Sequence, residues 1–183
     1  MKKVSRGDIL DYVTYEERRN ELRQQALQAK DLRRIHLGPF MTFLFENTDT
    51  VRYQIQEMVR IEKMVKEENI KHEIDTYNEL LPKEGELSCT LLIEFEEPHE
   101  RTEMLSKLVA LPKHLYLRLK SGEKSYAQFD ARQLNEDKLS AVQFLKFKCF
   151  EAPVAIGSDH PEFRDEQELR PEQAQTLLND LSN

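Results

Sequence analysis

The sequence is poor in cysteine, and it has no apolar run long enough to cross a membrane. Its two cysteines, Cys89 and Cys149, lie in strand-like apolar runs without a CxxC or Cys/His pattern. We therefore expect buried free thiols in a reducing compartment. The longest apolar runs fall far short of the roughly 20 residues that a bilayer span requires, and no apolar signal segment follows Met1. These absences predict a soluble, cytoplasmic protein.

The common catalytic signatures are absent as well. The sequence contains no GxGxxG, GxxxxGK, HExxH or GxSxG motif, which argues against ordinary dinucleotide, P-loop, zincin and α/β-hydrolase sites. The formal net charge of −7 argues against general nucleic-acid binding. Two histidines near strands, His36 and His114, are expected to be structural, and His160 is expected to be solvated in a loop.

The 183 residues are 39% apolar and 33% charged, which suits one domain with a strongly ionised surface. The order of helical and strand-like segments predicts an α+β domain over 1–183, with a mainly antiparallel sheet of about five strands and helices packed on it. Residues 151–183 are expected to form an acidic loop and a final helix. Helices are expected at 14–34, 50–66, 67–81 and 134–139, and two more are expected to begin at Pro98 and Pro171. Strands are expected at 40–45, 88–95 and 141–150. A hairpin is expected at 115–129 and a loop at 152–160.

The run Phe40–Phe45 is apolar at nearly every position and is typical of a strand buried on both faces. We expect it at the centre of the sheet, with 88–95 and 141–150 beside it.

The helices expected at 50–66 and 67–81 carry polar groups where a core-facing surface should be apolar. On a helical wheel, Gln54 and Glu62 fall within the stripe formed by Val51, Ile55, Met58, Ile61 and Val65. A carboxylate in such a stripe needs a partner. We therefore expect Glu62 and Gln54 to be buried, with Arg34, Arg52, Arg60 or a metal ion beside Glu62. The pair Arg33–Arg34 is expected to meet buried carboxylates of these helices.

A metal site is one reading of this region. Four residues are candidate ligands, and their oxygen-rich chemistry would suit iron or manganese better than structural zinc: Glu57, Glu62, His72 and Glu73. The alternatives are a solvated charged face and a buried structural salt bridge. The wider set of candidate ligand-binding residues is Arg34, Gln54, Glu57, Arg60, Glu62, Glu73, Tyr77 and Glu94.

Several short motifs carry a resemblance. They are Phe45-Glu46-Asn47, Thr50, Gln54-x-x-Glu57-Met58-x-Arg60-x-Glu62, His72-Glu73-x-Asp75-x-Tyr77-Asn78, Pro82, and Glu86-Leu87-x-x-Thr90-Leu91-x-x-Glu94. The chain resembles a bacterial family of unknown function over nearly its whole length. Members of that family tend to be encoded beside rubrerythrin-like proteins and iron–sulfur oxidoreductases. The resemblance implies a link to peroxide or iron-dependent redox metabolism and supplies no catalytic residue.

Three functions follow from these patterns. The first is a cytoplasmic accessory protein of a redox or oxidative-stress system, binding a metal ion or small ligand between the two helices and the sheet. The second is a non-catalytic interaction module whose buried ions set the specificity of the fold. The third is an enzyme that uses Glu62 or Glu73 as a general base beside an arginine.

Overall fold

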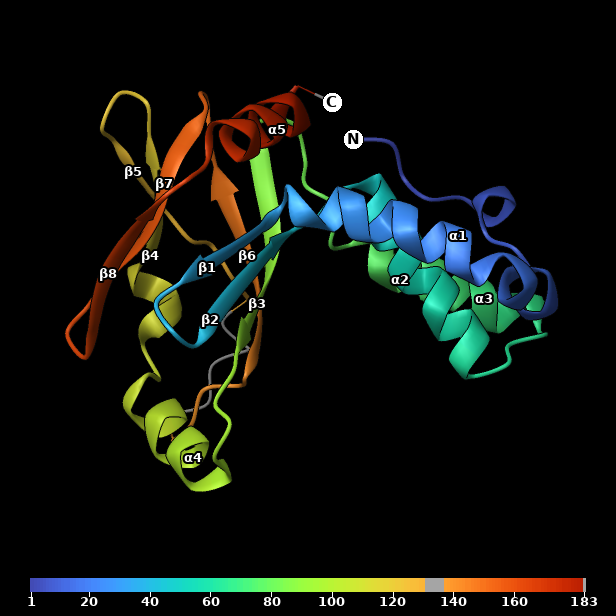
Figure 1. Cartoon of the computed structure of the whole chain (residues 1–183), viewed down its shortest axis with the longest axis horizontal. Coiled ribbons are helices and arrows are strands. Elements are labelled where there is room, and N and C mark those ends of the chain that lie inside the picture. Colours follow the sequence, from blue (N-terminus) through green and yellow to red (C-terminus); the bar gives the residue numbers. More distant parts are fainter. Residues whose placement is uncertain (131–136, 183) are drawn as a thin grey trace.

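The structure is a computed structural model, and it describes residues 1–130 and 137–182. Eight strands form two antiparallel sheets of four (Figure 1). Sheet A has the order β1-β2-β3-β6, and its strands are β1 Arg34–Leu37, β2 Met41–Phe45, β3 Glu86–Ile93 and β6 Val142–Lys148. Sheet B has the order β5-β4-β7-β8, and its strands are β4 Leu115–Leu119, β5 Lys124–Tyr126, β7 Pro153–His160 and β8 Phe163–Glu168.

The helices are α1 Tyr12–Asp31, α2 Thr48–Ile61, α3 Glu67–Asn78, α4 Pro98–Lys107 and α5 Pro171–Leu181, with short 3-10 turns η1 Arg6–Asp8 and η2 Leu111–His114. The predicted α+β class is confirmed, and the strands divide between two sheets. Among the described residues, no helix is both long enough and apolar enough to span a membrane.

The two sheets enclose the larger hydrophobic core. Alternate residues of β2 point into it, namely Met41, Phe43 and Phe45, and the inner faces of β3, β4 and β6 meet them. The sheets also touch at both edges, because Gln128, two residues after β5, bridges to Lys146 of β6, and the ring of Phe163 lies over the β1–β2 turn at Gly38. The result is a flattened barrel whose interior is filled by side chains.

Helices close the two ends of this barrel. Leu105 of α4 and Leu111 of η2 are buried in its core at one end, and Leu177 of α5 is buried in it at the other. Figure 1 shows α5 above the strands and α4 below them. Pro98 and Pro171 stand at the first positions of α4 and α5, as the sequence predicts, because proline there removes no helical hydrogen bond.

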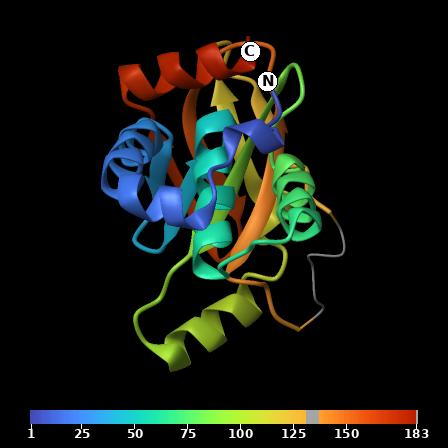
Figure 2. The same ribbon diagram turned by 90° about the vertical axis from the view of Figure 1, so that its right-hand side faces the viewer.

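The remaining helices, α1 to α3, form a separate layer with its own core. Val51, Ile55 and Val59 of α2 pack with Ile70 and Ile74 of α3 and with the N-terminal segment. This layer stands to one side of sheet A, and the three helices lie side by side when that side faces the viewer (Figures 1 and 2). The side chain of Asn78 ties the N-terminal segment down, because it bonds both the N–H and the carbonyl of Val4 at 2.9 Å.

Strand β2 lies inside sheet A between β1 and β3, and β3 pairs with β6, so the predicted central strand is confirmed. The hairpin predicted at 115–129 is also confirmed as β4–β5.

Other boundaries differ from the prediction. Helix α1 begins at Tyr12, earlier than the predicted residue 14, because Asp11 caps it, and it ends at Asp31, so that Arg34 opens β1. The loop predicted at 152–160 is strand β7, and β8 lies within the predicted acidic loop. Of the helix predicted at 134–139, residues 134–136 lie outside the described residues, and residues 137–139 are not helical.

Candidate functional site

Glu57 of α2 meets two arginine side chains, Arg19 of α1 and Arg60 of α2. Its carboxylate accepts hydrogen bonds from Arg19 Nε and Nη2 at 2.9 and 3.0 Å, from Tyr15 Oη at 2.7 Å and from Arg60 Nη2 at 3.3 Å. Burial disfavours the charged carboxylate, but the hydrogen bonds from Arg19 and Tyr15 outweigh it, so the pKa of Glu57 is lowered. This network joins α1 to α2. It is a structural ion network of the kind that the sequence suggested, built around a different glutamate.

The prediction that Glu62 and Gln54 are buried is wrong. Both residues are exposed, and Glu62 lies just beyond the end of α2 at Ile61. The chain turns at Lys63, whose φ of 48° ends the helix, so Val65 is not part of the α2 stripe and is 73% exposed. The true inner stripe is Val51, Ile55 and Val59, and it excludes Gln54.

The four predicted metal ligands do not converge. Glu57 is occupied by Arg19 and Tyr15, Glu62 is exposed, and His72 points away from the core as an exposed residue of α3 beside the half-buried Glu73. Within residues 1–130 and 137–182, no group of three or more His, Cys, Asp or Glu side chains is arranged to hold a metal ion. The iron or manganese site predicted from helical spacing is therefore not formed by these residues.

The other predicted residues are scattered over the fold. Arg34 is exposed on β1, where its carbonyl accepts from Gln173 Nε2 at 2.9 Å. Tyr77 packs against the core of the helical layer. Glu94 is exposed at the end of β3 and accepts from Thr42 Oγ1 at 2.7 Å. Binding of a ligand by these residues stays a prediction.

Two basic residues have partners other than those predicted. Arg33 pairs with Asp180 of α5, and Arg52 pairs with Asp49 within α2. Neither contacts Glu62. The prediction for the two cysteines is confirmed, because Cys89 and Cys149 are buried free thiols. Burial raises the pKa of both thiols, that of Cys149 to about 12.

Glu46 is the buried carboxylate that the helical wheel did not identify. It stands between β2 and α2 and is only 8% exposed. Thr90 Oγ1 of β3 donates to one of its oxygens at 2.7 Å, and Thr50 Oγ1 of α2 donates to the other at 2.6 Å. Among the described residues, no lysine or arginine nitrogen lies within 4.0 Å of this carboxylate. A carboxylate that directly follows a buried strand and precedes a helix cap is the signal that could have identified it.

The position of Glu46 is fixed by the chain on both sides. Asn47 caps α2 by accepting from the Thr50 N–H at 2.9 Å, while the Asn47 N–H donates to Thr50 Oγ1 at 2.9 Å. The Glu46 N–H donates to the Ser88 carbonyl at 2.9 Å, which continues the β2–β3 pairing. The carboxylate is therefore held by the junction between sheet A and the helical layer.

A pocket of about 470 Å³ opens at this junction, which we call the junction pocket. It combines three carboxylates, one lysine and two aromatic side chains. Its lining is Glu46, Glu79, Leu80, Ser88, Cys89, Thr90, Gln128, Phe129, Asp130, Phe144, Leu145 and Lys146. The acidic groups outnumber the single ammonium group, and the walls are largely apolar. Such a lining favours a ligand with a positive charge and an apolar body.

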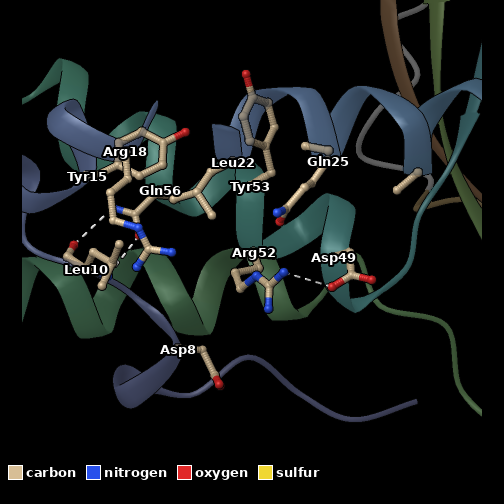
Figure 3. Close-up of a pocket in the computed structure, with 12 residues that line it drawn as sticks. Asp8, Leu10, Tyr15, Arg18, Leu22, Gln25, Asp49, Arg52, Tyr53 and Gln56 are labelled. Atoms are coloured by element: carbon tan, nitrogen blue, oxygen red, sulfur yellow. Dashed lines mark hydrogen bonds and ion pairs between the residues drawn. The ribbon is translucent and has the colours of Figure 1, made fainter. Parts of the chain in front are cut away.

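A second cavity of about 400 Å³ lies between α1, α2 and the N-terminal segment (Figure 3). Three of its polar side chains are engaged with groups of the same lining. Gln56 bonds the N–H and carbonyl of Leu10 at 2.8 and 2.9 Å, and Arg52 turns toward Asp49 at 3.0 Å. Because these side chains hold the protein's own backbone and charges, the junction pocket is the stronger candidate.

Comparisons with known proteins agree with the fold and give no activity. No curated protein matches the chain. A solved structure from Burkholderia pseudomallei K96243, described as a novel protein of unknown function, is 30% identical in sequence with a TM-score of 0.90, and the alignment covers 98% of this chain and 100% of that one. A family model matches residues 3–181, and the chain belongs to that family, described as "Protein of unknown function (DUF3501)".

Proposed function

We propose that this protein binds a small organic cation, a primary amine with an apolar body, in the junction pocket. The observation that supports the proposal is the Glu46 carboxylate. It is buried, it accepts two threonine hydroxyls, and among the described residues no lysine or arginine nitrogen lies within 4.0 Å of it, although Lys30 attracts it from a greater distance.

The energetics of burial favour such a ligand. An ionised carboxylate that is removed from water costs several kcal/mol unless a cation or enough donors compensate it. Two neutral hydroxyls and the more distant Lys30 ammonium supply part of that compensation. An ammonium group supplies the opposite charge and three further donors.

The walls of the junction pocket suit the rest of the ligand. Phe129 and Phe144 present aromatic rings on which an ammonium or its neighbouring methylene groups can rest. Leu80 adds apolar surface. The volume of about 470 Å³ falls within the usual range for small-molecule sites.

This proposal keeps the small-ligand part of the function expected from the sequence and changes the residues and the ligand class. A cytoplasmic role beside rubrerythrin-like and iron–sulfur proteins remains a further proposal that rests on the family resemblance alone. Affinity purification from cells that encode those proteins, with and without added peroxide, tests it directly.

The amine proposal is tested by thermal unfolding at pH 7.5 and constant ionic strength, with butylamine, putrescine and agmatine as probes and butanol as the neutral analogue. We expect at least one amine to raise the melting temperature in a saturable way, and butanol to have no such effect. Glu46→Gln keeps the shape of the side chain and removes its charge, so the amine effect should disappear.

The matched control is Glu94→Gln. Glu94 also accepts from a threonine hydroxyl of sheet A, but it is exposed and lies outside the junction pocket. The amine effect should survive in this variant. An amine effect of the same size in Glu46→Gln, or no amine effect in the unmodified protein, contradicts the proposal.

A further inference from the structure

The outer face of sheet B carries a second cluster of ionisable groups around a shallow depression of about 620 Å³. The depression is lined by Lys113 and His114 of η2, Tyr126 of β5, Asp159 of β7 and Arg164 of β8. Four elements thus supply five side chains. The cluster exists only when sheet B is folded, and it is independent of the junction pocket.

Asp159 is the centre of this cluster. One of its oxygens lies 2.9 Å from His114 Nδ1, and the other accepts from Tyr126 Oη at 2.6 Å. The hydrogen bond from Tyr126 is the largest influence on the carboxyl, and with that of His114 it lowers the pKa of Asp159. An ionised Asp159 only accepts hydrogen bonds, so the facing nitrogen of His114 carries a proton. The tautomer of His114 is thereby fixed, and Nε2 is the nitrogen left for a ligand.

His160 packs against the imidazole ring of His114. Its ring stands edge-on to that of His114, with centroids 5.1 Å apart, and it is 4% exposed. The expectation that His160 is solvated in a loop is therefore wrong. Burial and the neighbouring His114 lower the pKa of His160, and its Nδ1 accepts from the Glu162 N–H at 3.2 Å. His160 thus restricts the orientation of His114.

The depression has an excess of positive charge on a chain whose net charge is −7. Among the described residues, neither Lys113 nor Arg164 has a carboxylate within 4.0 Å. The only carboxylate in the lining, Asp159, is already bonded to His114 and Tyr126. Two unpaired cations and an oriented imidazole thus border one hollow.

We infer that this depression binds the terminal phosphate group of a small molecule, through Lys113, Arg164 and His114 Nε2. A phosphate has three terminal oxygens directed to different sides, and the three nitrogen groups come from two separate elements, η2 and β8. The nitrogen Nε2 accepts from a protonated phosphate oxygen, or it donates to an ionised one when the imidazole is charged. The hollow is large enough for a small molecule beyond the phosphate.

The test is a titration of the full chain with inorganic phosphate and with pyrophosphate, at an ionic strength held constant with chloride. The readout is the set of histidine ring signals in a carbon–proton correlation spectrum. The chain has five histidines, and the His114 signal is assigned from its loss in His114→Asn. We expect a saturable shift of the His114 signal, while the exposed His72 and His99 do not shift in that way.

Matched variants distinguish phosphate binding in the depression from a general attraction of phosphate to positive surface charge. Lys113→Ala and Arg164→Ala should each weaken binding by about tenfold, which is typical for the loss of one charge-assisted hydrogen bond. Lys71→Ala and Lys83→Ala remove the same charge from exposed positions outside the depression and should leave binding unchanged. His114→Asn retains an amide donor toward Asp159 and should also weaken binding, as followed by phosphorus line widths.

Three outcomes overturn the inference. They are a His114 signal that does not shift, a shift that rises linearly without saturation, and equal weakening in the Lys71 and Arg164 variants. Retained signals of the buried His160 in the Lys113 and Arg164 variants, and a retained circular-dichroism spectrum in His114→Asn, show that sheet B remains folded, so loss of binding is not confused with loss of structure.

Discussion

Arg33 and Asp180 are 147 residues apart in the sequence and form a two-point ion pair. Arg33 Nε and Nη2 donate to the two carboxylate oxygens of Asp180 at 2.7 and 2.9 Å, and the side chains are only 12% and 7% exposed. Arg33 Nη1 also donates to the Ala29 carbonyl at 2.9 Å. The pair therefore fastens α5 to the segment that links α1 with β1.

Asp180→Ala should destabilise the protein by about 3–5 kcal/mol, because it leaves the Arg33 charge largely buried without its partner. Urea unfolding followed by circular dichroism measures the change. Glu103→Ala is the control, because it breaks the exposed Lys107 pair on α4 and should have little effect. Equal loss in the two variants would show that the Arg33–Asp180 pair has no special role.

The outcome for Arg33 shows what a sequence pattern can locate. The basic pair Arg33–Arg34 indicated that an arginine there would need a buried carboxylate, and Arg33 has one. The partner could not be predicted, because Asp180 lies on α5, which follows all the strands of both sheets in the sequence. Short-range periodicity contains no information on such a contact.

Among the strands too, some could be predicted from local sequence and others could not. Strand β2 was predictable because its residues are apolar on both faces. Strand β7 was not predictable, because Gly157, Ser158 and Asp159 have low strand propensity and are ordered by pairing with β4 and β8.

The wrong prediction for Glu62 has a local cause. Exposed Ile61 and Val65 shifted the apolar stripe on the helical wheel, since the wheel assumed a helix that continues beyond Ile61.

Glu57 leads to a prediction about pH. Its pKa is lower in the folded protein than the ordinary glutamate value of 4.5. Its contribution to stability is therefore complete above the unfolded pKa and is lost as the pH falls through the folded pKa. The free energy of unfolding of Glu57→Gln should be below that of the unmodified protein at pH 7, and the difference should shrink as the pH falls below about 4.5. Urea unfolding at a series of pH values measures this, and a difference that grows on acidification would contradict it.

The ring of Tyr116 on β4 lies against the backbone of Gly157 on β7. A Cβ at position 157 would stand 2.6 Å from both Cζ and Oη of Tyr116, which is closer than a Cβ approaches other heavy atoms in proteins. Tyr116 is held in place, because its hydroxyl donates to Glu166 at 2.9 Å and Lys124 Nζ lies 3.8 Å from its ring centroid. Gly157→Ala should therefore destabilise the protein by about 1–3 kcal/mol through overpacking.

The control for Gly157 is Gly7→Ala, where the added Cβ meets only Ser5 Oγ at 3.9 Å, an ordinary contact. The second test is Gly157→Ala in a Tyr116→Ser background, where the ring is gone and most of the cost should disappear. A cost for Gly157→Ala that is the same with and without the ring would mean that the backbone, and not Tyr116, requires glycine. The comparison is a double-mutant cycle measured by urea unfolding.

For Gln143 on β6 we predict a substitution that does not lower the stability of the protein. Its side chain is fully buried among the inner residues of sheet A, and its Oε1 has no hydrogen-bond partner within the part of the chain that the structure describes. Its Nε2 donates to the Ser140 carbonyl at 3.0 Å, and Ser140 is exposed, so water can replace that donor. A buried acceptor without a partner costs about 1–3 kcal/mol. Gln143→Met keeps the length of the side chain and removes the unpaired oxygen, so it should leave stability unchanged or raise it by about 1 kcal/mol.

Leu145→Ala on the same strand is the contrasting variant, because it leaves a cavity in the barrel core and should cost about 2–5 kcal/mol. A loss of stability in Gln143→Met of similar size to that in Leu145→Ala would show that the Gln143 amide is fully satisfied in solution.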